Sequence, residues 1–202
     1  AGGANSDRAH SIATDIFGNI IITGVFRDTA IFGSTTLVSS GNSQDIFIAK
    51  LDSNGNFLWA KSFGGSNTDI ASKITTDNSG NIIVCGEFKG TSSFGSYTFT
   101  SAVYPPLMQQ QAGQPSYDAL IFKTDPNGNV VWAKAGSAPF DDRAVSITTD
   151  NTNNIYVCGQ YSDTITFGNT YNNNSFNAGF VMKTDSSGNE TWFRRLVASQ
   201  FM

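Results

Sequence analysis

Acidic residues recur at a fixed spacing in this sequence, and they are the first candidates for chemistry. Asp7, Asp69 and Asp142 each lie eight residues before another aspartate. A ring of such carboxylates at the mouth of a radially repeated fold could bind a cation or the hydroxyl groups of a sugar. The recurrence also fits a structural role, in which each carboxylate accepts hydrogen bonds from loop amides. We favour amide capping and keep ligand binding as the alternative.

Four further aspartates open short motifs rich in Asn and Gly. Asp52, Asp77, Asp125 and Asp185 begin DSNGN, DNSGN, DPNGN and DSSGN. The calcium loop of an EF-hand places its glycine sixth, with acids at the first, third and fifth positions. Here the glycine is fourth and no second acid follows. The motifs therefore predict tight turns capped by the aspartate, with weak calcium binding as the alternative.

The residues that usually hold metals or act in catalysis are scarce. His10 is the only histidine, and no cluster of His and Cys accompanies it, so neither a metal site nor a catalytic triad is predicted. Cys85 and Cys158 occupy matching positions, where Thr23 is the third counterpart. We expect small side chains packed between repeated units, too far apart for a disulfide. No cofactor is predicted.

Lysine and tryptophan form a third recurring pair. Lys50, Lys123 and Lys183 are each followed nine residues later by a tryptophan, namely Trp59, Trp132 and Trp192. An enzyme would need one privileged lysine, so three equivalent ones predict a repeated ion pair or hydrogen bond within each unit. We expect the tryptophans to pack between units, and stacking on sugars is the alternative.

These markers belong to a repeat of about sixty residues that occurs three times. The matching segments are SIATDIFGNIIITGVF from Ser11 to Phe26, KITTDNSGNIIVCGEF from Lys73 to Phe88, and SITTDNTNNIYVCGQY from Ser146 to Tyr161. Each copy predicts four antiparallel strands, with a small hairpin between the second and the third. No sustained helical periodicity is present, so helices are not expected.

The second copy carries an insertion, residues 101–116, with the sequence SAVYPPLMQQQAGQPS. Loops on a rigid scaffold often carry binding, so this insertion is the best single place to look for specificity. An idle surface insertion is the alternative. The candidate binding residues in and beside it are Tyr104, Pro105, Pro106, Leu107, Met108 and Tyr117.

The order of these markers resembles the bacterial β-propeller repeat known as the SBBP repeat. The resemblance covers about residues 2 to 195 and implies an all-β, propeller-like fold with three consecutive four-stranded blades. We expect the blades at residues 1–63, at 64–135 with the insertion at 101–116, and at 136–202 with a C-terminal tail. Such repeats occur mainly in secreted or cell-surface bacterial proteins, so an extracellular or cell-surface location is expected.

The third copy departs from the pattern. It has Asn153 and Asn154 where the others have Gly-Asn, Ala178 where the others have Asp45 and Asp118, and a tail, LVASQFM, without the Gly-Gly pair. Three blades do not close a propeller, which usually has four to eight. We expect the chain to be part of a longer propeller, with pairing of two copies into six blades, or another closure, as alternatives. It starts just before a first strand and ends just after a fourth, so no exchange of strands between first and last blade is expected.

Composition and net charge limit the classes of partner that this protein could bind. The formal net charge is −4 and no basic cluster exceeds Arg194-Arg195, which disfavours nucleic acid, and no apolar run is long enough to insert in a membrane. The main hypothesis is a non-catalytic structural or interaction module that presents loops, with a protein partner or the remaining blades of a longer chain bound to it. The alternative is a lectin with an equivalent glycan pocket at every blade interface. A third hypothesis, an enzyme, would need an active site outside these residues.

Overall fold

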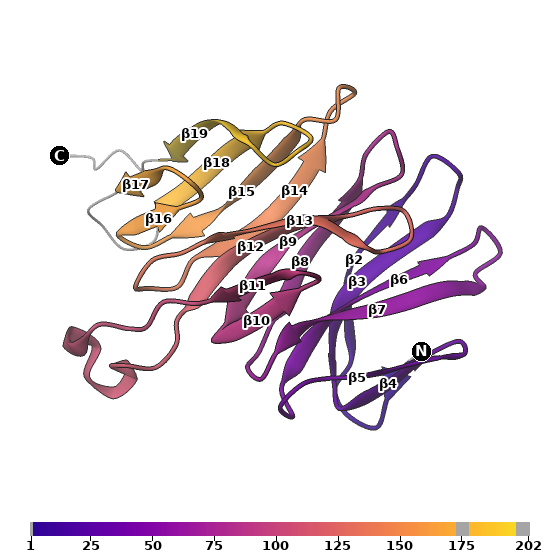
Figure 1. Cartoon of the computed structure of the whole chain (residues 1–202), viewed down its shortest axis with the longest axis horizontal. Helices are drawn as coiled ribbons and strands as arrows, with labels where there is room; N and C mark the ends of the chain where they lie inside the picture. The colour runs from indigo at the N-terminus through magenta and orange to yellow at the C-terminus, as the bar shows by residue number, and fades with distance from the viewer. Residues whose placement is uncertain (1, 173–177, 197–202) are drawn as a thin grey trace.

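The computed structural model describes residues 2–172 and 178–196. Within these ranges the chain is all-β apart from one short 3-10 helix, and it has a β-propeller-like architecture of three consecutive four-stranded antiparallel sheets (Figure 1). We call these sheets blade 1, blade 2 and blade 3. The predicted fold class is therefore confirmed. No helix in this part of the chain is long and apolar enough to cross a membrane.

Each blade is built in the same strand order. Blade 1 contains β2 (Arg8–Thr14), β3 (Ile20–Arg27), β6 (Gln44–Leu51) and β7 (Phe57–Gly65). Blade 2 contains β8 (Ile70–Thr76), β9 (Ile82–Lys89), β12 (Tyr117–Thr124) and β13 (Val130–Gly136). Blade 3 contains β14 (Arg143–Thr149), β15 (Ile155–Tyr161), β18 (Ala178–Thr184) and β19 (Glu190–Leu196). Strands β7 and β13 end just beyond the expected boundaries at 63/64 and 135/136, and the division into blades 1–63, 64–135 and 136–202 remains a prediction.

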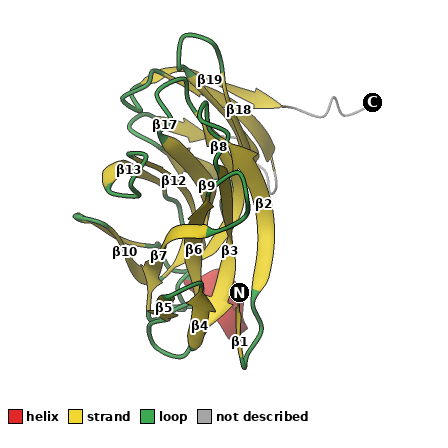
Figure 2. Cartoon of the chain, turned by 90° about the vertical axis from the view of Figure 1, so that its right-hand side faces the viewer, coloured by secondary structure: helices red, strands yellow, loops and turns green. Residues whose placement is uncertain are grey.

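The first strands of the three blades lie side by side, as expected for the inner strands of a propeller. The Thr76 hydroxyl donates to the Thr14 carbonyl (2.8 Å), and the Thr149 hydroxyl donates to the Thr76 carbonyl (2.8 Å). These bonds link β2 to β8 and β8 to β14. Figure 2 views the chain from the blade 1 end and shows β2 and β3 at the near side.

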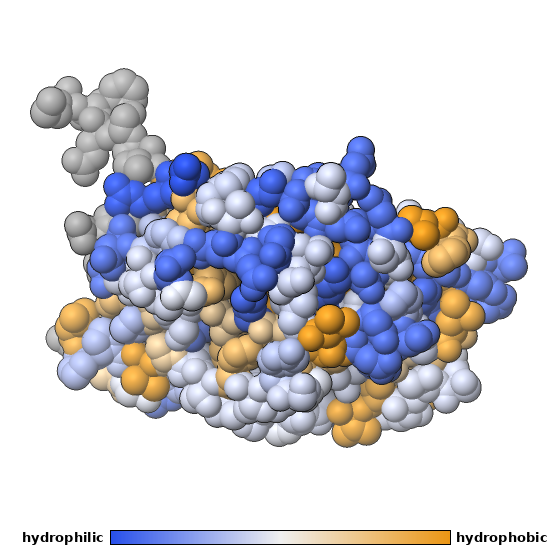
Figure 3. All heavy atoms as spheres, turned by 45° about the horizontal axis from the view of Figure 1, so that its top comes forward, coloured by the Kyte–Doolittle hydropathy of each residue, from blue (hydrophilic) through white to orange (hydrophobic). Residues whose placement is uncertain are grey.

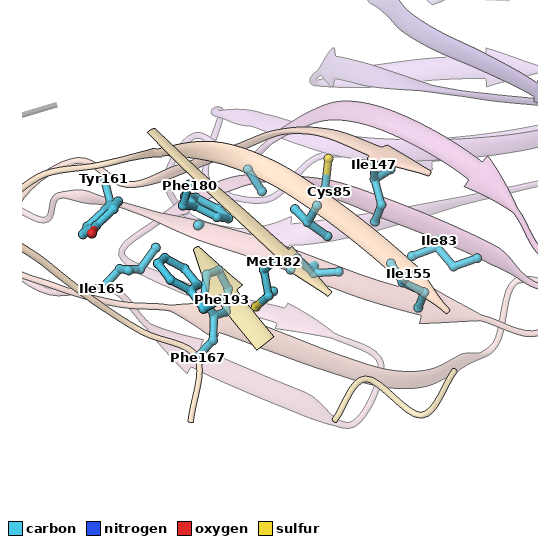
Figure 4. Packing of buried hydrophobic residues seen from close by; sticks show 14 of the residues in the cluster. Ile83, Cys85, Ile147, Ile155, Tyr161, Ile165, Phe167, Phe180, Met182 and Phe193 are labelled. Atoms are coloured by element: carbon cyan, nitrogen blue, oxygen red, sulfur yellow. The ribbon is translucent and has the colours of Figure 1, made fainter. Parts of the chain in front are cut away.

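The space between neighbouring blades is filled by apolar side chains. Between blades 1 and 2, Ile46, Ile48 and Phe63 of blade 1 pack with Val84, Phe88 and Phe122 of blade 2. The cluster between blades 2 and 3 is shown in Figure 4. Its labelled members are Ile83, Cys85, Ile147, Ile155, Tyr161, Ile165, Phe167, Phe180, Met182 and Phe193. Each blade thus contributes one face to each neighbour, because side chains alternate along its strands.

Small hairpins add a second link between blades. The hairpin of blade 2 comprises β10 (Thr91–Phe94) and β11 (Tyr97–Thr100), and β10 pairs with Gly64 and Gly65 at the end of β7 of blade 1. The counterpart in blade 1 comprises β4 (Thr29–Phe32) and β5 (Thr35–Val38). In blade 3 it comprises β16 (Thr164–Thr166) and β17 (Thr170–Asn172).

Two features differ from the sequence-based expectation. Gly2–Gly3 forms a short strand, β1, that pairs with β4 in the way that Gly64 and Gly65 pair with β10. The sequence pattern did not predict this two-residue strand, which precedes the first strand of blade 1. The insertion contains a 3-10 helix, η1 (Pro106–Gln111), although no helix was expected. A 3-10 turn of this length needs no helical periodicity, so the pattern could not reveal it.

The recurring glycines Gly24, Gly86 and Gly159 are explained by a close approach of two strands. Opposite them, a β-bulge interrupts the pairing of the first strand with the second in every blade. A Cβ atom on Gly86 would lie only 1.9 Å from the Ile70 carbonyl oxygen. No larger residue fits there without moving the backbone.

We expect Gly86→Ala to lower the free energy of unfolding by about 1 to 3 kcal/mol, because the new methyl group overlaps backbone that cannot rotate away. Urea denaturation followed by circular dichroism measures the change. Gly179→Ala is the control, since its Cβ would meet only Leu196 side-chain atoms, at 3.2 Å or more, and Leu196 is exposed. Equal losses in the two variants would contradict this explanation.

Candidate functional site

The six turns that follow the first and third strands use their aspartates as caps. In the turn at Asp52, one carboxylate oxygen accepts hydrogen bonds from the backbone N–H groups of Asn54 and Asn56, both 2.9 Å. The Asn56 side-chain amide donates to the other oxygen (2.9 Å). Asp77, Asp125 and Asp185 repeat this arrangement. The prediction of turn capping is confirmed, and these carboxylates are engaged by the turns.

Asn153 stands where the other two copies have a glycine, and the local backbone explains why it is tolerated. Asn153 has a φ of 63°, and the glycines that it replaces, Gly18 and Gly80, have φ values of 77° and 74°. Asparagine tolerates this left-handed conformation better than other residues with a side chain. Its side-chain oxygen also accepts a hydrogen bond from the Asn78 N–H (2.9 Å), which joins the turns of blades 2 and 3.

The recurring lysines of blades 1 and 2 form buried ion pairs within their blade. Lys50 Nζ lies 2.8 Å from Asp15, and Lys123 Nζ lies 2.8 Å from Asp77. Burial raises the pKa of Asp15, but the hydrogen bonds from Lys50 and Asn19 outweigh it and lower the pKa to about 2. The predicted repeated ion pair is confirmed for these two blades.

The same lysines also reach the next blade. Lys50 Nζ donates to the Pro126 carbonyl of blade 2 (3.3 Å), and Lys123 Nζ donates to the Ser186 carbonyl of blade 3 (3.1 Å). Lys183 of blade 3 has no ion pair within the described ranges and lies 5.4 Å from the centre of the Tyr156 ring. Lys50 and Lys123 therefore each link their own blade to the following one.

Two of the three tryptophans, Trp59 and Trp132, have the packing role between blades that the sequence predicted, whereas Trp192 contacts Tyr156 and Arg194 of its own blade. Trp59 and Trp132 lie against the turn glycines of the following blade, Gly128 and Gly188. A Cβ atom on either glycine would lie 3.0 Å from the indole ring, which is too close unless the ring moves. The indole N–H of Trp132 donates to the Ser186 carbonyl (3.2 Å), and its side chain is buried. The buried ring of Trp132 is not available to stack on a sugar, whereas Trp59 is half-buried.

Two of the three candidate aspartates, Asp69 and Asp142, are fully buried at the blade junctions. Asp69 accepts hydrogen bonds from the Ser92 hydroxyl and the Gly65 N–H, each 2.7 Å. Asp142 accepts one from the Ser162 N–H (3.1 Å). Both therefore cap loop amides or a neighbouring hydroxyl. Asp7 is half-buried and accepts the matching bond from the Gly3 N–H.

A second carboxylate lies beside each buried one. Asp45 faces Asp69, and Asp118 faces Asp142. In these buried pairs, Asp45 Oδ1 and Asp142 Oδ2 have no hydrogen-bond partner among the described residues. In the sequence, Asp45 and Asp118 stand out only as counterparts of Ala178. Their recurrence at the start of the third strand was the signal that could have placed them at the junction.

Burial and the facing charge shift the pKa of these groups upward. Burial, opposed by hydrogen bonds and reinforced by Asp45, raises the pKa of Asp69 to about 7. Burial, reinforced by Asp118 and Asp141, raises that of Asp142 to about 8. Burial also raises the pKa of Asp45 and of Asp118 to about 6. Among the described residues, no group of three or more His, Cys, Asp or Glu side chains is arranged to hold a metal.

The insertion folds back toward the junction of blades 2 and 3. Tyr104 is buried, and its hydroxyl donates to Asp141, which also accepts the Tyr117 N–H (3.0 Å). Leu107 is the most exposed apolar side chain of the insertion at 69%, and Pro106 is also exposed. Pro105, Met108 and Tyr117 are half-buried. The candidate residues of the insertion therefore differ in exposure, and Leu107 and Met108 line one shallow pocket together.

A polar groove lies at the junction of blades 1 and 2. Its volume is about 500 Å³, within the usual range for ligand sites. Two cations, Arg27 and Lys89, and the ring of Tyr117 line it, and neither cation forms an ion pair within the described ranges. The remaining lining residues are amides and hydroxyls: Asn42, Ser43, Gln44, Ser66, Asn67 and Thr68.

Tyr117 is the one predicted site residue in this groove. Sequence reasoning missed Arg27 and Lys89, although they occupy matching positions in the first and second copies. At the next junction the residues that match Asn67 and Thr68 are Phe140 and Asp141, and Phe140 is buried. The groove is thus not repeated with the same residues, which departs from the equivalent pockets that the lectin hypothesis expects.

The remaining candidate residues, His10, Cys85 and Cys158, have environments that fit a structural role. His10 is exposed, lies at the bulge of β2, and its Nδ1 donates to the Ala71 carbonyl of blade 2 (2.7 Å). Cys85 is buried between blades 2 and 3, as expected, whereas Cys158 is half-buried. Burial raises the pKa of the Cys85 thiol well above its usual range, so it is a poor nucleophile.

Comparison with known proteins agrees with a propeller. No family model matches the sequence. An uncharacterised WD repeat-containing protein of Acanthamoeba polyphaga mimivirus is 30% identical over 199 aligned residues, which cover 88% of this chain. The chain spans 14% of the length of that relative. WD repeats form propeller blades of four strands, the architecture seen here.

Proposed function

We propose that this protein is a non-catalytic interaction module, a rigid propeller scaffold that presents its junction loops to a protein partner. The proposal rests on the contacts that the recurring residues make in the structure. In blades 1 and 2, the lysine, tryptophan and buried aspartate side chains all bond or pack to a neighbouring blade or loop. The residues that could have done chemistry therefore hold the scaffold together.

The groove at the junction of blades 1 and 2 is the best candidate contact surface. It is formed by loops from two blades, and the blades fix the positions of these loops. Arg27 and Lys89 give it a positive rim on a chain whose net charge is −4. Electrostatic complementarity favours a partner that presents acidic groups. On the face shown in Figure 3, hydrophilic side chains dominate and apolar ones form separate spots.

The test compares partner capture by the wild-type protein and by an Arg27→Ala/Lys89→Ala variant. We expect a partner from the source cells that binds the wild type and binds the variant at least about tenfold more weakly, since charged interface pairs carry this much free energy. Lys73→Ala/Arg194→Ala is the control because it removes the same charge from exposed positions outside the groove. A partner retained equally by all three proteins would contradict the assignment of the groove.

A location outside the cell is part of the proposal. It is supported by the resemblance to the bacterial SBBP repeat and by the low share of charged residues, 14%. Digestion of intact producing cells with a protease should remove the protein if it is on the surface. Protection of the protein until the cells are lysed would contradict this location.

Glycan binding is the second candidate function. The amides and hydroxyls that line the groove match the hydrogen-bonding groups of a sugar, and Arg27 and Lys89 would favour an acidic saccharide. A glycan array separates the two functions: binding to acidic saccharides that is lost in Arg27→Ala/Lys89→Ala favours the lectin. An array without signal, together with a retained protein partner, excludes it.

A further inference from the structure

Two aspartates at the junction of blades 1 and 2 form a buried pair without a counter-charge. Asp45 is 3% exposed, Asp69 is fully buried, and the charge of Asp45 acts on Asp69. Within the described ranges, neither forms an ion pair with a lysine or an arginine. Buried charges in proteins are paired or coordinate a metal, because burying an isolated charge is costly. The pair therefore needs a proton or a cation to balance its charge.

The carboxylates of this pair keep oxygen lone pairs that no protein group uses. Asp45 Oδ2 accepts a hydrogen bond from the Ser40 N–H (2.9 Å), whereas the buried Asp45 Oδ1 has no hydrogen-bond partner among the described residues. Asp69 accepts one bond at each oxygen, from the Ser92 hydroxyl and from the Gly65 N–H. A carboxylate oxygen has two lone pairs, so both aspartates can still bind a cation.

Gly64 lets the free oxygens of the two aspartates approach the same point. A Cβ atom on Gly64 would lie 2.6 Å from Asp69 Oδ2 and 3.0 Å from Asp45 Oδ1, so a side chain there would block both. The hydroxyl of Ser92, a residue of the blade 2 hairpin, adds a third kind of oxygen 2.7 Å from Asp69 Oδ1. The matching residue of the blade 3 hairpin is Ile165, which offers no oxygen.

The junction of blades 2 and 3 has the same carboxylates but fills this place with hydroxyl groups. Asp118 and Asp142 face each other there. Ser137 stands at the position of Gly64, and its side chain hydrogen-bonds to Asp118. The Ser116 hydroxyl also donates to Asp118 (3.3 Å). Although Asp142 Oδ2 has no partner among the described residues, the serines occupy the space that the glycine leaves open at the first junction.

We propose that Asp45, Asp69 and Ser92 bind a calcium ion at the junction of blades 1 and 2. The two charges of the ion balance the two carboxylates. Every ligand is an oxygen atom, which calcium and magnesium both prefer. Magnesium demands a near-ideal octahedron, whereas calcium accepts irregular sets of six to eight oxygens, and the site offers an irregular set.

The polar groove at this junction gives the ion a route and further ligands. Its lining includes Gln44 and Thr68, which directly precede Asp45 and Asp69 in the chain. Calcium needs more oxygens than two aspartates and one serine supply, and water in the groove can provide them. The bound ion joins a strand of blade 1 to the connection that leads into blade 2 and to the blade 2 hairpin. It therefore holds the two blades together.

Thermal unfolding with and without calcium tests the proposal. The protein is first freed of metal with a chelator and is measured at pH 8, above the pKa of both carboxylates. We expect a saturating concentration of calcium chloride to raise the unfolding midpoint by about 5 °C or more, because an ion that binds only the folded state stabilises it. The same concentration of magnesium chloride should raise it less. Equilibrium dialysis should find one calcium ion per chain.

Asp45→Asn locates the ion. The variant should lose the calcium-dependent shift, and with chelator it should be at least as stable as the wild type, because the amide oxygen can still accept the Ser40 N–H and the repulsion is gone. Asp118→Asn makes the same change at the second junction and should keep the full shift. A wild type that calcium does not stabilise overturns the proposal, as does a shift that survives in Asp45→Asn or disappears in Asp118→Asn.

Discussion

Replacing Lys123 by methionine should lower the free energy of unfolding by about 3 to 5 kcal/mol, the usual cost of removing one partner of a buried ion pair. Lys123 and Asp77 are both buried and 2.8 Å apart. The substitution keeps the apolar stem but leaves the Asp77 carboxylate without its counter-charge. It also removes the hydrogen bond to the Ser186 carbonyl, so the contact of blade 2 with blade 3 weakens.

Lys183→Met is the matched control for this prediction. The residue occupies the same place in blade 3, but it is half-buried and has no ion pair within the described ranges. We expect its loss to change the free energy of unfolding by less than about 1 kcal/mol, as for an exposed charge. Urea denaturation at pH 7 measures both. Similar losses in the two variants would show that the buried pair contributes no more than a surface charge.

The protein should become more stable as the pH falls from 8 to 5. The pKa of Asp69 is raised to about 7 and that of Asp142 to about 8, from 3.8. When the folded pKa is raised, the unfolded chain releases its proton first. The stabilisation is then fully present below pH 4 and is lost as the pH rises through the folded pKa values. Each pKa unit corresponds to about 1.4 kcal/mol, so we expect a change of several kcal/mol.

At lower pH a different group reverses this trend. The pKa of Asp15 is lowered to about 2, so its contribution is present above pH 4 and is lost as the pH falls through 2. The free energy of unfolding should therefore reach its maximum at about pH 4 to 5. Urea midpoints measured from pH 3 to 9 give this profile. A maximum at pH 8 would contradict the assignment of raised pKa values to the junction carboxylates.

Asp142→Asn isolates the contribution of one carboxylate to this profile. The amide oxygen can still accept the hydrogen bond from the Ser162 N–H, and the charge that faces Asp118 is removed. We expect the variant to be more stable than the wild type at pH 8 by at least about 2 kcal/mol and to have a flatter pH profile. Asp163→Asn, which removes an exposed charge nearby, is the control and should leave the profile unchanged.

The repeat, its four strands and its turns could be predicted from the amino-acid sequence. The turns at Asp52 and Asp125 were predictable because the carboxylate and the amides that it caps are within four residues of each other. An ion pair or hydrogen bond of Lys50 within its blade could be expected from its recurrence, but its partner, Asp15, could not be named from the sequence. Local spacing and periodicity carry this information.

The contacts between the blades could not be predicted from the sequence. The facing of Asp45 and Asp69, the groove with Arg27 and Lys89, and the different exposure of Ile12 and Ile74 all depend on how one sheet packs on the next. Equivalent residues have the same sequence signal in every copy, but their burial depends on whether a neighbouring blade is present. A single repeat cannot show that difference, because it arises from contacts that the repeat makes outside itself.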